Sequence, residues 1–178
     1  MESIQPAVLV SEPQAAVSAK RECMIWYDQY GTSVLRLCYL YLGSTAAAAH
    51  AAQSVFVRLW EQLDRHVHFT SVSVRLWLIR TAVKICRKEK CHLPAQKPAP
   101  VSQDPLLSSS DDLTSEDMEL IAGIMHLPEK TRSVVLLVCW QKLSFVETAS
   151  ILHIRPVTVL RQLEKAQDLL GKTNESWR

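Results

Sequence analysis

Four polar side chains near the C-terminal end have the types and the spacing of a nucleic-acid contact. They recur at i, i+3, i+4 and i+7 and therefore share one face of a helix: Thr158, Arg161, Gln162 and Lys165. Arg161 and Gln162 have the geometry for paired hydrogen bonds to base edges, and Lys165 suits a phosphate. The same spacing fits, equally well, an ordinary amphipathic helix with a polar solvent face.

Two short helices are expected to position this face. Ser144–Leu152 and Pro156–Leu170 are separated by three residues only, which is the connection length of a helix-turn-helix. Ser144 and Glu147 have capping-box spacing at the start of the first helix, and Pro156 suits the first position of the second. The second helix should bury an apolar stripe made of Val159, Leu163, Ala166 and Leu170.

A second candidate surface lies on a helix predicted at Val72–Cys91. An apolar stripe is expected at Leu76, Ile79, Val83 and Cys86, with Trp77, Arg80, Lys84, Arg87 and Lys88 on the neighbouring arc. An aromatic ring beside basic side chains favours a nucleic-acid surface. The alternatives are that Trp77 belongs to the core and that the basic residues form a solvated face.

The positive charge of the chain is concentrated around this second surface. Residues 23–92 hold nine basic and four acidic side chains, a net +5, whereas residues 1–22 carry −1, 93–115 carry −2 and 116–178 carry 0. A clustered basic patch indicates a polyanion partner.

The whole chain is expected to be all-α. It holds only four glycines, and its apolar residues repeat every three or four positions without strand-like alternation. Helices are predicted at Met24–Leu42, Thr45–Leu63 and Val72–Cys91, and then at Ser115–Met125, Pro128–Trp140 and the helix-turn-helix pair. Residues 93–115 are rich in Pro, Ser and Asp, which predicts a flexible linker. The expected division is an N-terminal extension at 1–22, a first domain at 23–92, the linker at 93–115 and a second domain at 116–174.

Other classes of function find little support. No apolar run reaches the roughly 18 residues of a membrane span, and no secretory signal is visible, so a cytoplasmic protein without a membrane partner is expected. The five cysteines are odd in number and scattered, which favours reduced thiols. Cys86, Cys91 and His92 lack the paired spacing of a metal site. No phosphate-binding glycine loop or nucleophile motif is present, so no catalytic residue, metal or cofactor is expected.

The second domain resembles region four of sigma factors. The resemblance is carried by residues 127–137 (LPEKTRSVVLL), 143–152 (LSFVETASIL) and Thr158-Val159, which are similar to the family's LPxxxRxVxLL, LSxxEIAxxL and GTVxSR motifs. In that family this domain recognises the upstream, minus-thirty-five promoter element. The resemblance therefore implies a set of residues that contact this element: Arg155, Thr158, Arg161, Gln162 and Lys165.

Some positions depart from the family pattern. His153 occupies the turn position usually held by Gly, where left-handed backbone angles are expected. Arg155 and Val157 replace a small cap and a Gly, and Leu160 and Gln162 stand where Lys and Arg are usual. Weaker phosphate attraction, or a different promoter sequence, is the expected consequence.

The first domain resembles region two of the same family. Residues 74–84 (VRLWLIRTAVK) look like the FRAWLxxIAxN helix, which contacts the minus-ten element. By analogy, the preceding loop at residues 64–73 would face a base extruded from the non-template strand, where stacking offsets the cost of unstacking. The implied start-proximal set is His66, His68, Phe69, Arg75, Trp77, Arg80, Lys84, Arg87 and Lys88.

Upstream of this helix, residues 30–38 and 53–60 resemble the family's first helices and its DxxQEVFxxxW motif. The second helix should bury Ala48, Ala52, Val55, Phe56 and Leu59. One outward face then remains, here called the polymerase face: His50, Gln53, Ser54 and Val57. In sigma factors this face grips the clamp helices of the large polymerase subunit. Because His50 and Ser54 replace the usual acids, the grip would depend on shape and Gln53, or the factor would be weak or assisted.

Two functions follow from these observations. The first is an extracytoplasmic-function sigma factor, which recruits core RNA polymerase to promoter DNA and opens it without catalysing a reaction itself. The second is a sigma-like helix-turn-helix regulator with weak or lost polymerase attachment. The resemblance covers both domains and favours the first, and it leaves open an anti-sigma factor as a further partner.

Overall fold

The computed structural model describes residues 12–65, 67–92 and 115–171, and the regular elements among these residues are all helices, with no strand. The helices are α1 (Glu12–Leu42), α2 (Thr45–Asp64), α3 (Ser71–His92), α5 (Ser115–His126), α6 (Glu129–Val135), a π-helical turn η2 (Leu136–Trp140), α7 (Phe145–Leu152) and α8 (Pro156–Gly171). The predicted all-α fold is confirmed. The predicted linker at 93–115 lies, except for Ser115, outside the described residues.

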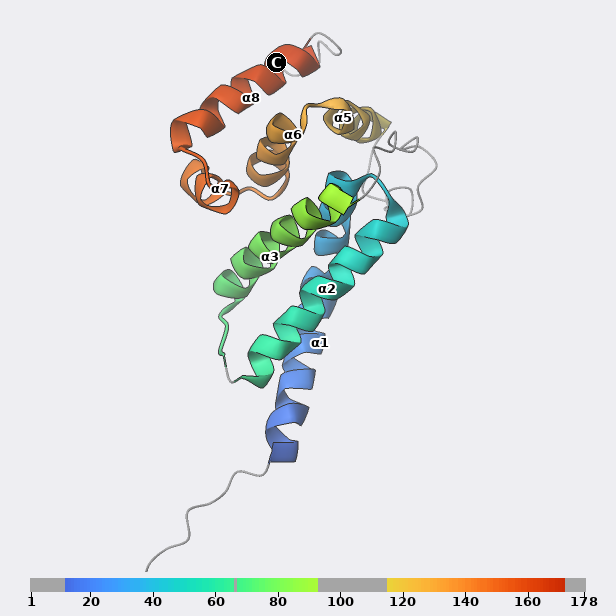
Figure 1. Cartoon of the computed structure of the whole chain (residues 1–178), viewed down its shortest axis with the longest axis vertical. Helices are drawn as coiled ribbons and strands as arrows, with labels where there is room; N and C mark the ends of the chain where they lie inside the picture. The colour runs from blue at the N-terminus through green and yellow to red at the C-terminus, as the bar shows by residue number, and fades with distance from the viewer. Residues whose placement is uncertain (1–11, 66, 93–114, 172–178) are drawn as a thin grey trace, which may run out of the picture.

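Helices α1, α2 and α3 pack together and are here called the N-terminal bundle (Figure 1). Gly43 separates the first two helices with a positive φ of 70°, a conformation that glycine adopts without strain. Ser44 then caps α2, because its side chain accepts a hydrogen bond from the amide of Ala47. The bundle is filled by large, fully buried side chains that include Leu37, Leu40, Val55, Leu59 and Leu78.

Helix α1 begins at Glu12, well before the predicted start at Met24. Residues 12–23 contain three alanines and few apolar side chains. Alanine has the highest intrinsic helix propensity, so this stretch extends the helix without an apolar stripe. A search for apolar periodicity therefore places the start too late. The later residues of the predicted N-terminal extension thus belong to α1.

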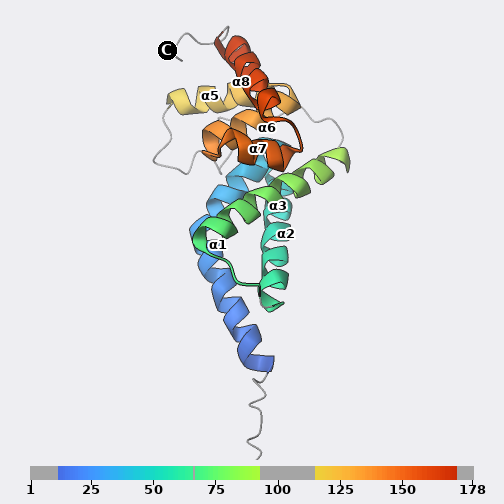
Figure 2. The ribbon, with the colours of Figure 1, turned by 90° about the vertical axis from the view of Figure 1, so that its left-hand side faces the viewer.

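The remaining elements, α5 to α8 with η2, form a second group here called the C-terminal bundle. Its core contains Ile121, Val134, Leu136, Leu137, Val159 and Ala166, and the buried apolar residues of both bundles belong to one cluster. Figures 1 and 2 place this bundle over one end of the N-terminal bundle, with α7 beside α3 and α8 farther out.

The helix-turn-helix has the local geometry expected from its sequence. At the start of α7, Ser144 Oγ accepts from the amide of Glu147, and the Glu147 carboxylate accepts from the Ser144 amide at 2.8 Å. After α7, His153 adopts the left-handed conformation with φ 56° and ψ 45°. The Ile154 amide then donates to the Ala149 carbonyl at 3.0 Å. The turn is therefore the left-handed helix ending that usually contains glycine.

We predict that His153→Gly stabilises the protein. A non-glycine residue in the left-handed region costs about 1–2 kcal/mol, and the added freedom of glycine in the unfolded chain offsets roughly half of this. The expected gain is about 0.5–1 kcal/mol, measured as a higher urea midpoint. His153→Ala keeps the strain and serves as the control. A lower midpoint for the glycine variant than for the alanine variant would contradict the assignment.

The Glu147 carboxylate should contribute to stability in a pH-dependent way. The hydrogen bonds from the Ser144 hydroxyl and amide favour the charged form and lower the pKa of Glu147. A depressed folded-state pKa gives stability that is present above the unfolded pKa of about 4.3 and is lost as pH falls through the folded value. Wild type should exceed Glu147→Gln in melting temperature at pH 7, and the difference should shrink towards pH 3. Glu119→Gln, at an exposed position of α5, should leave the melting temperature nearly unchanged at both pH values.

Candidate nucleic-acid and polymerase interfaces

The outer surface of α8 carries the basic residues predicted to bind the upstream element. Arg161 and Lys165 are exposed, and Arg155 is exposed in the preceding turn; these three residues are here called the recognition face. The Arg155 carbonyl accepts from the Thr158 amide at 2.8 Å and thereby starts α8. The acidic Glu164 and Asp168 are also exposed on this helix. They reduce its net attraction for phosphates.

Gln162 is partly exposed, less so than the sequence prediction of an outward-facing side chain implies. Its side-chain oxygen accepts a hydrogen bond of 2.8 Å from the hydroxyl of Thr131 on α6, and Thr131 is buried. Thr158 is also only partly exposed. The bond to Thr131 places Gln162 on the side of α8 that borders α6. The predicted buried stripe is confirmed at Val159, Ala166 and Leu170, whereas Leu163 is partly buried.

Helix α3 presents most of the predicted basic arc to solvent. Arg80, Lys84, Arg87 and Lys88 are all exposed. The apolar side differs in part from the prediction: Ile79, Val83 and Cys86 are buried as expected, but Leu76 is only half-buried. Val74, Leu78 and Ala82 complete the buried face instead. Packing against both α1 and α2 widens this face beyond a single stripe.

An aromatic pair lies at the start of α3. Phe69 and Trp77 are half-buried, with ring centroids 5.6 Å apart and planes tilted by 58°. Trp77 therefore packs against the core edge and contacts the loop, so neither predicted alternative describes it fully. His68 is exposed beside this pair in the sequence, and His66 lies outside the described residues.

Two arginines of the start-proximal set contact the C-terminal bundle. The Arg75 guanidinium donates a hydrogen bond to the backbone carbonyl of Gln141, in the turn between η2 and α7. The Arg80 guanidinium donates to the hydroxyl of Ser150 on α7 at 3.4 Å. Sequence reasoning did not foresee these contacts, because apolar periodicity describes each helix separately.

The polymerase face forms a shallow pocket on α2. His50, Gln53, Ser54 and Val57 line it together with Arg58 and Glu61. All the predicted buried residues of α2 are buried, so the predicted outward face is confirmed as a surface, with Ser54 partly covered. His50 Nδ1 lies 3.6 Å from the Glu89 carboxylate of α3. Two acids, Glu61 of α2 and Glu89 of α3, thus adjoin the four residues of the polymerase face, although none of those four is acidic.

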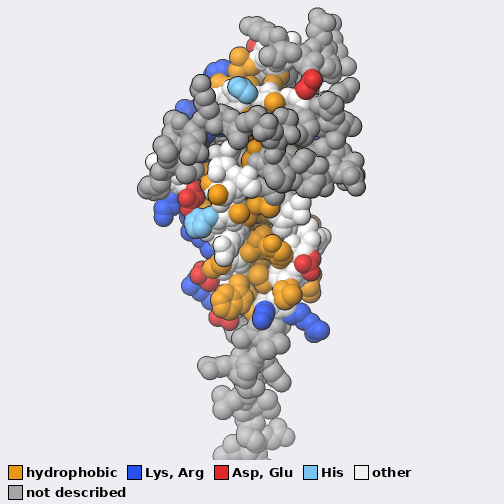
Figure 3. Space-filling view, turned by 90° about the vertical axis from the view of Figure 1, so that its right-hand side faces the viewer, with side chains coloured by type: hydrophobic (Ala, Val, Ile, Leu, Met, Phe, Trp, Pro, Cys, Tyr) orange, Lys and Arg blue, Asp and Glu red, His pale blue; other side chains and the backbone are white. Residues whose placement is uncertain are grey.

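An apolar groove between α1 and α2 continues this surface. It shares Gln53 and Val57 with the polymerase face and is also lined by Tyr27, Phe56 and Trp60. Tyr27 and Trp60 remain 58% and 46% exposed, and Figure 3 shows hydrophobic side chains gathered over these helices. Sequence reasoning missed Tyr27. The available signal was helical spacing, because Tyr27 shares one face of α1 with Cys23, Tyr30 and Val34.

The cysteines of this chain are unpaired by disulfides. All five cysteines are free thiols, as expected. Cys38 and Cys86 are buried in contact with each other, and their hydrogen bond together with burial raises the pKa of Cys86. Among the described residues, no group of three or more His, Cys, Asp or Glu side chains is placed to hold a metal ion. None of the helices in residues 12–65, 67–92 and 115–171 combines the length and apolar character of a membrane span.

Comparison with known proteins places both bundles in one family. Residues 26–90 match sigma-70 region 2, and residues 117–166 match sigma-70 region 4. The ECF RNA polymerase sigma factor SigW of Bacillus subtilis (strain 168) is 28% identical over 158 residues, which cover 82% of this chain and 84% of that relative. The structure of CnrH in complex with the cytosolic domain of CnrY has the same fold, with a TM-score of 0.62, 17% identity, and coverage of 94% of this chain and 96% of that chain. Because the two matched regions coincide with the two helical bundles, this chain belongs to the sigma-70 family, and within it to the ECF sigma factors.

Proposed function

We propose that this chain directs transcription initiation by binding core RNA polymerase and promoter DNA on separate surfaces. The observation that carries the proposal is that each sigma-70 region match coincides with a bundle that presents exposed basic side chains. The polymerase face lies on α2, whereas the two basic surfaces lie on α3 and α8. The chain would position polymerase and trap the melted strand in the cytoplasm without catalysing a reaction itself. The division into domains at 23–92 and 116–174 is part of this proposal.

At the upstream element, Arg161 and Lys165 would make the principal contacts of α8, with Arg155 adding a phosphate contact from the turn. Their exposure supports this role. The oxygen of Gln162 accepts from the Thr131 hydroxyl, so Gln162 would offer chiefly its side-chain NH2 donors to a base. Gln162 and Thr158 are therefore secondary contacts in this proposal.

At the start-proximal element, Phe69 and Trp77 would stack against an extruded base while basic side chains hold the strand. The half-buried pair supports this role, because packing against the core fixes the rings while one side stays accessible. Stacking of a base on an aromatic side chain contributes about 1–3 kcal/mol. Lys84, Arg87 and Lys88 are exposed and would bind the phosphates.

The polymerase contact would depend more on shape than on charge. His50 and Ser54 contribute no negative charge to the polymerase face, whereas Val57, Tyr27 and Trp60 offer exposed apolar area along the adjoining groove. Buried aromatic side chains often dominate the energy of such interfaces. An anti-sigma factor is a further partner that the proposal allows.

The proposal is tested by run-off transcription with core polymerase and fragments of the source genome. Discrete transcripts that require the protein, together with a complex between the protein and core polymerase, are expected. Gln53→Ala should weaken this complex several-fold because it removes the polar centre of the polymerase face.

Gln167→Ala, which removes an exposed glutamine from α8, is the matched control and should bind core polymerase normally. If the protein retards duplex DNA but neither binds core polymerase nor yields transcripts, it is a helix-turn-helix regulator instead. The replacement of acids by His50 and Ser54 is the observation that favours this second function.

Removal of the two cations of α8 should weaken DNA binding in a salt-dependent way. For Arg161→Ala with Lys165→Ala, the slope of log affinity against log salt should flatten by about 0.9 for each phosphate that is no longer neutralised. The measurement is fluorescence anisotropy on a promoter fragment obtained by run-off mapping. Arg58→Ala with Lys130→Ala removes the same residue types from exposed positions elsewhere and should preserve the slope. An equal slope for the two double variants would exclude α8 as the DNA contact.

A further inference from the structure

The outward arc of α8 carries two large apolar side chains among its polar ones. Val157 is 60% exposed and Leu160 is 43% exposed; these two residues are here called the apolar pair. Four exposed side chains recur at i, i+3, i+4 and i+7 and therefore share one face of this helix: Val157, Leu160, Arg161 and Glu164. The apolar pair thus borders Arg161, which belongs to the recognition face.

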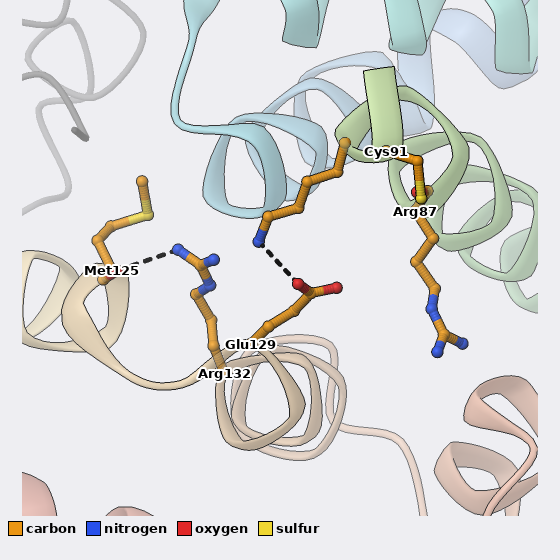
Figure 4. Close-up of polar contacts among 6 residues, drawn as sticks. Arg87, Cys91, Met125, Glu129 and Arg132 are labelled. Carbon is orange, nitrogen blue, oxygen red and sulfur yellow. Dashed lines mark hydrogen bonds and ion pairs between the residues drawn. The ribbon is translucent and has the colours of Figure 1, made fainter. Parts of the chain in front are cut away.

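Contacts with the neighbouring helices fix the rotation of α8 and so keep the apolar pair in solvent. Val159 is fully buried on the opposite side, and the Gln162 oxygen accepts a hydrogen bond of 2.8 Å from Thr131 of α6. Helix α6 is in turn held to the last turn of α5, because Arg132 Nη1 donates to the Met125 carbonyl at 3.0 Å (Figure 4). A rotation that buried the apolar pair would break the bond to Thr131 and expose Val159.

The charges on and beside α8 favour a polyanion at the end of the helix that holds the apolar pair. Residues 155–161 contain two arginines and no acid, a net +2, whereas residues 162–170 contain two acids and one lysine, a net −1. In helix-turn-helix complexes, the N-terminal residues of the second helix contact base edges in the major groove. DNA that follows this charge distribution therefore brings base edges to the apolar pair.

Only one group on the major-groove edges of the bases suits an apolar side chain. Thymine presents its C5 methyl group there, and the remaining groups are hydrogen-bond donors and acceptors. Neither Val157 nor Leu160 can satisfy a donor or an acceptor, so a polar edge placed against them loses water without gaining a partner. Contact with a methyl group instead removes apolar surface of both partners from water. The chemistry of the apolar pair therefore favours thymine over cytosine at the same position.

We propose that Val157 and Leu160 recognise thymine methyl groups in the duplex that α8 binds, and so help to determine which sequence is selected. This inference rests on the proposed DNA-binding role of α8 and deepens it. The cations of the recognition face attract the DNA whatever its sequence, whereas the apolar pair distinguishes thymine from the other bases.

The test begins with the full chain and a pool of random-sequence DNA duplexes. Duplexes that the protein retains through repeated rounds of selection are sequenced, which defines the preferred site without polymerase. Each thymine of that site is then replaced singly by deoxyuridine, which keeps the base pair and lacks only the methyl group. Binding of the fluorescein-labelled duplexes is followed by anisotropy. At the contacted thymines, the replacement should weaken binding by the wild-type chain about fourfold, the size expected for one buried methyl group.

Truncation of the apolar pair should remove this sensitivity. Val157→Ala with Leu160→Ala should bring the ratio of the two affinities near one, because the shortened side chains no longer cover the methyl group. Arg161→Ala should weaken binding to both duplexes and keep their ratio. Leu169→Ala is the matched control, because it shortens a side chain that is 37% exposed at the other end of α8. It should preserve both the affinity and the ratio.

Salt gives a second readout that separates the apolar pair from the cations. Added salt should weaken binding to both duplexes, because the phosphate contacts release counterions. The ratio between the thymine and deoxyuridine duplexes should stay constant, since a methyl contact releases none.

Equal binding of the two duplexes by the wild-type chain would overturn the inference, as would a pool in which no sequence is enriched. A ratio that survives the double truncation would overturn it too, and loss of core polymerase binding by that variant would then assign the apolar pair to a protein contact. Equal binding together with normal run-off transcription leaves the proposed function intact. Methyl discrimination without transcripts or core polymerase binding supports this inference and contradicts the proposed function.

Discussion

The structure depends on apolar packing along one side of α3, because the other side of this helix carries mutually repelling cations. One side of this helix packs against α1 and α2 through Val74, Leu78 and Ala82, whereas the other side carries a row of cations. Like charges on one helix repel, so such a row persists only where burial on the opposite side supplies the stabilising energy. The apolar packing of the N-terminal bundle therefore holds in place the row of cations on α3, whose mutual repulsion a bound polyanion would relieve.

The sequence predicted the elements well because the signals for helix ends and buried faces are local. Ser144 and Glu147 satisfy the backbone amides at the start of α7, and neither needs a tertiary partner to do so. The left-handed turn at His153 was predicted from the resemblance to the family pattern, in which Gly usually occupies this position. The outward face of α2 was also predicted correctly from the helical spacing of its apolar residues. These residues all face the two helices that α2 packs against, α1 and α3.

The sequence could not predict features that depend on how helices meet. Gln162 has the period of an exposed residue, yet the proximity of Thr131 on α6 turns it into an internal hydrogen-bond acceptor. Leu76 lies at a spacing that predicts burial, but it is only partly buried. Leu78 is fully buried instead, because α3 packs against both α1 and α2. The hydrogen bond of Arg80 with Ser150 joins positions 70 residues apart. No single-helix pattern contains such information.

The pairing of Cys38 with Cys86 has a consequence for following the protein in solution. Both thiols are shielded by the middle of the N-terminal bundle, whereas Cys91 and Cys139 face solvent. A thiol reacts as its thiolate, and the raised pKa of Cys86 slows that chemistry further. Alkylating reagents will therefore modify the outer cysteines first. The slower rate at which Cys38 and Cys86 are labelled will then measure how often the three helices separate by local unfolding.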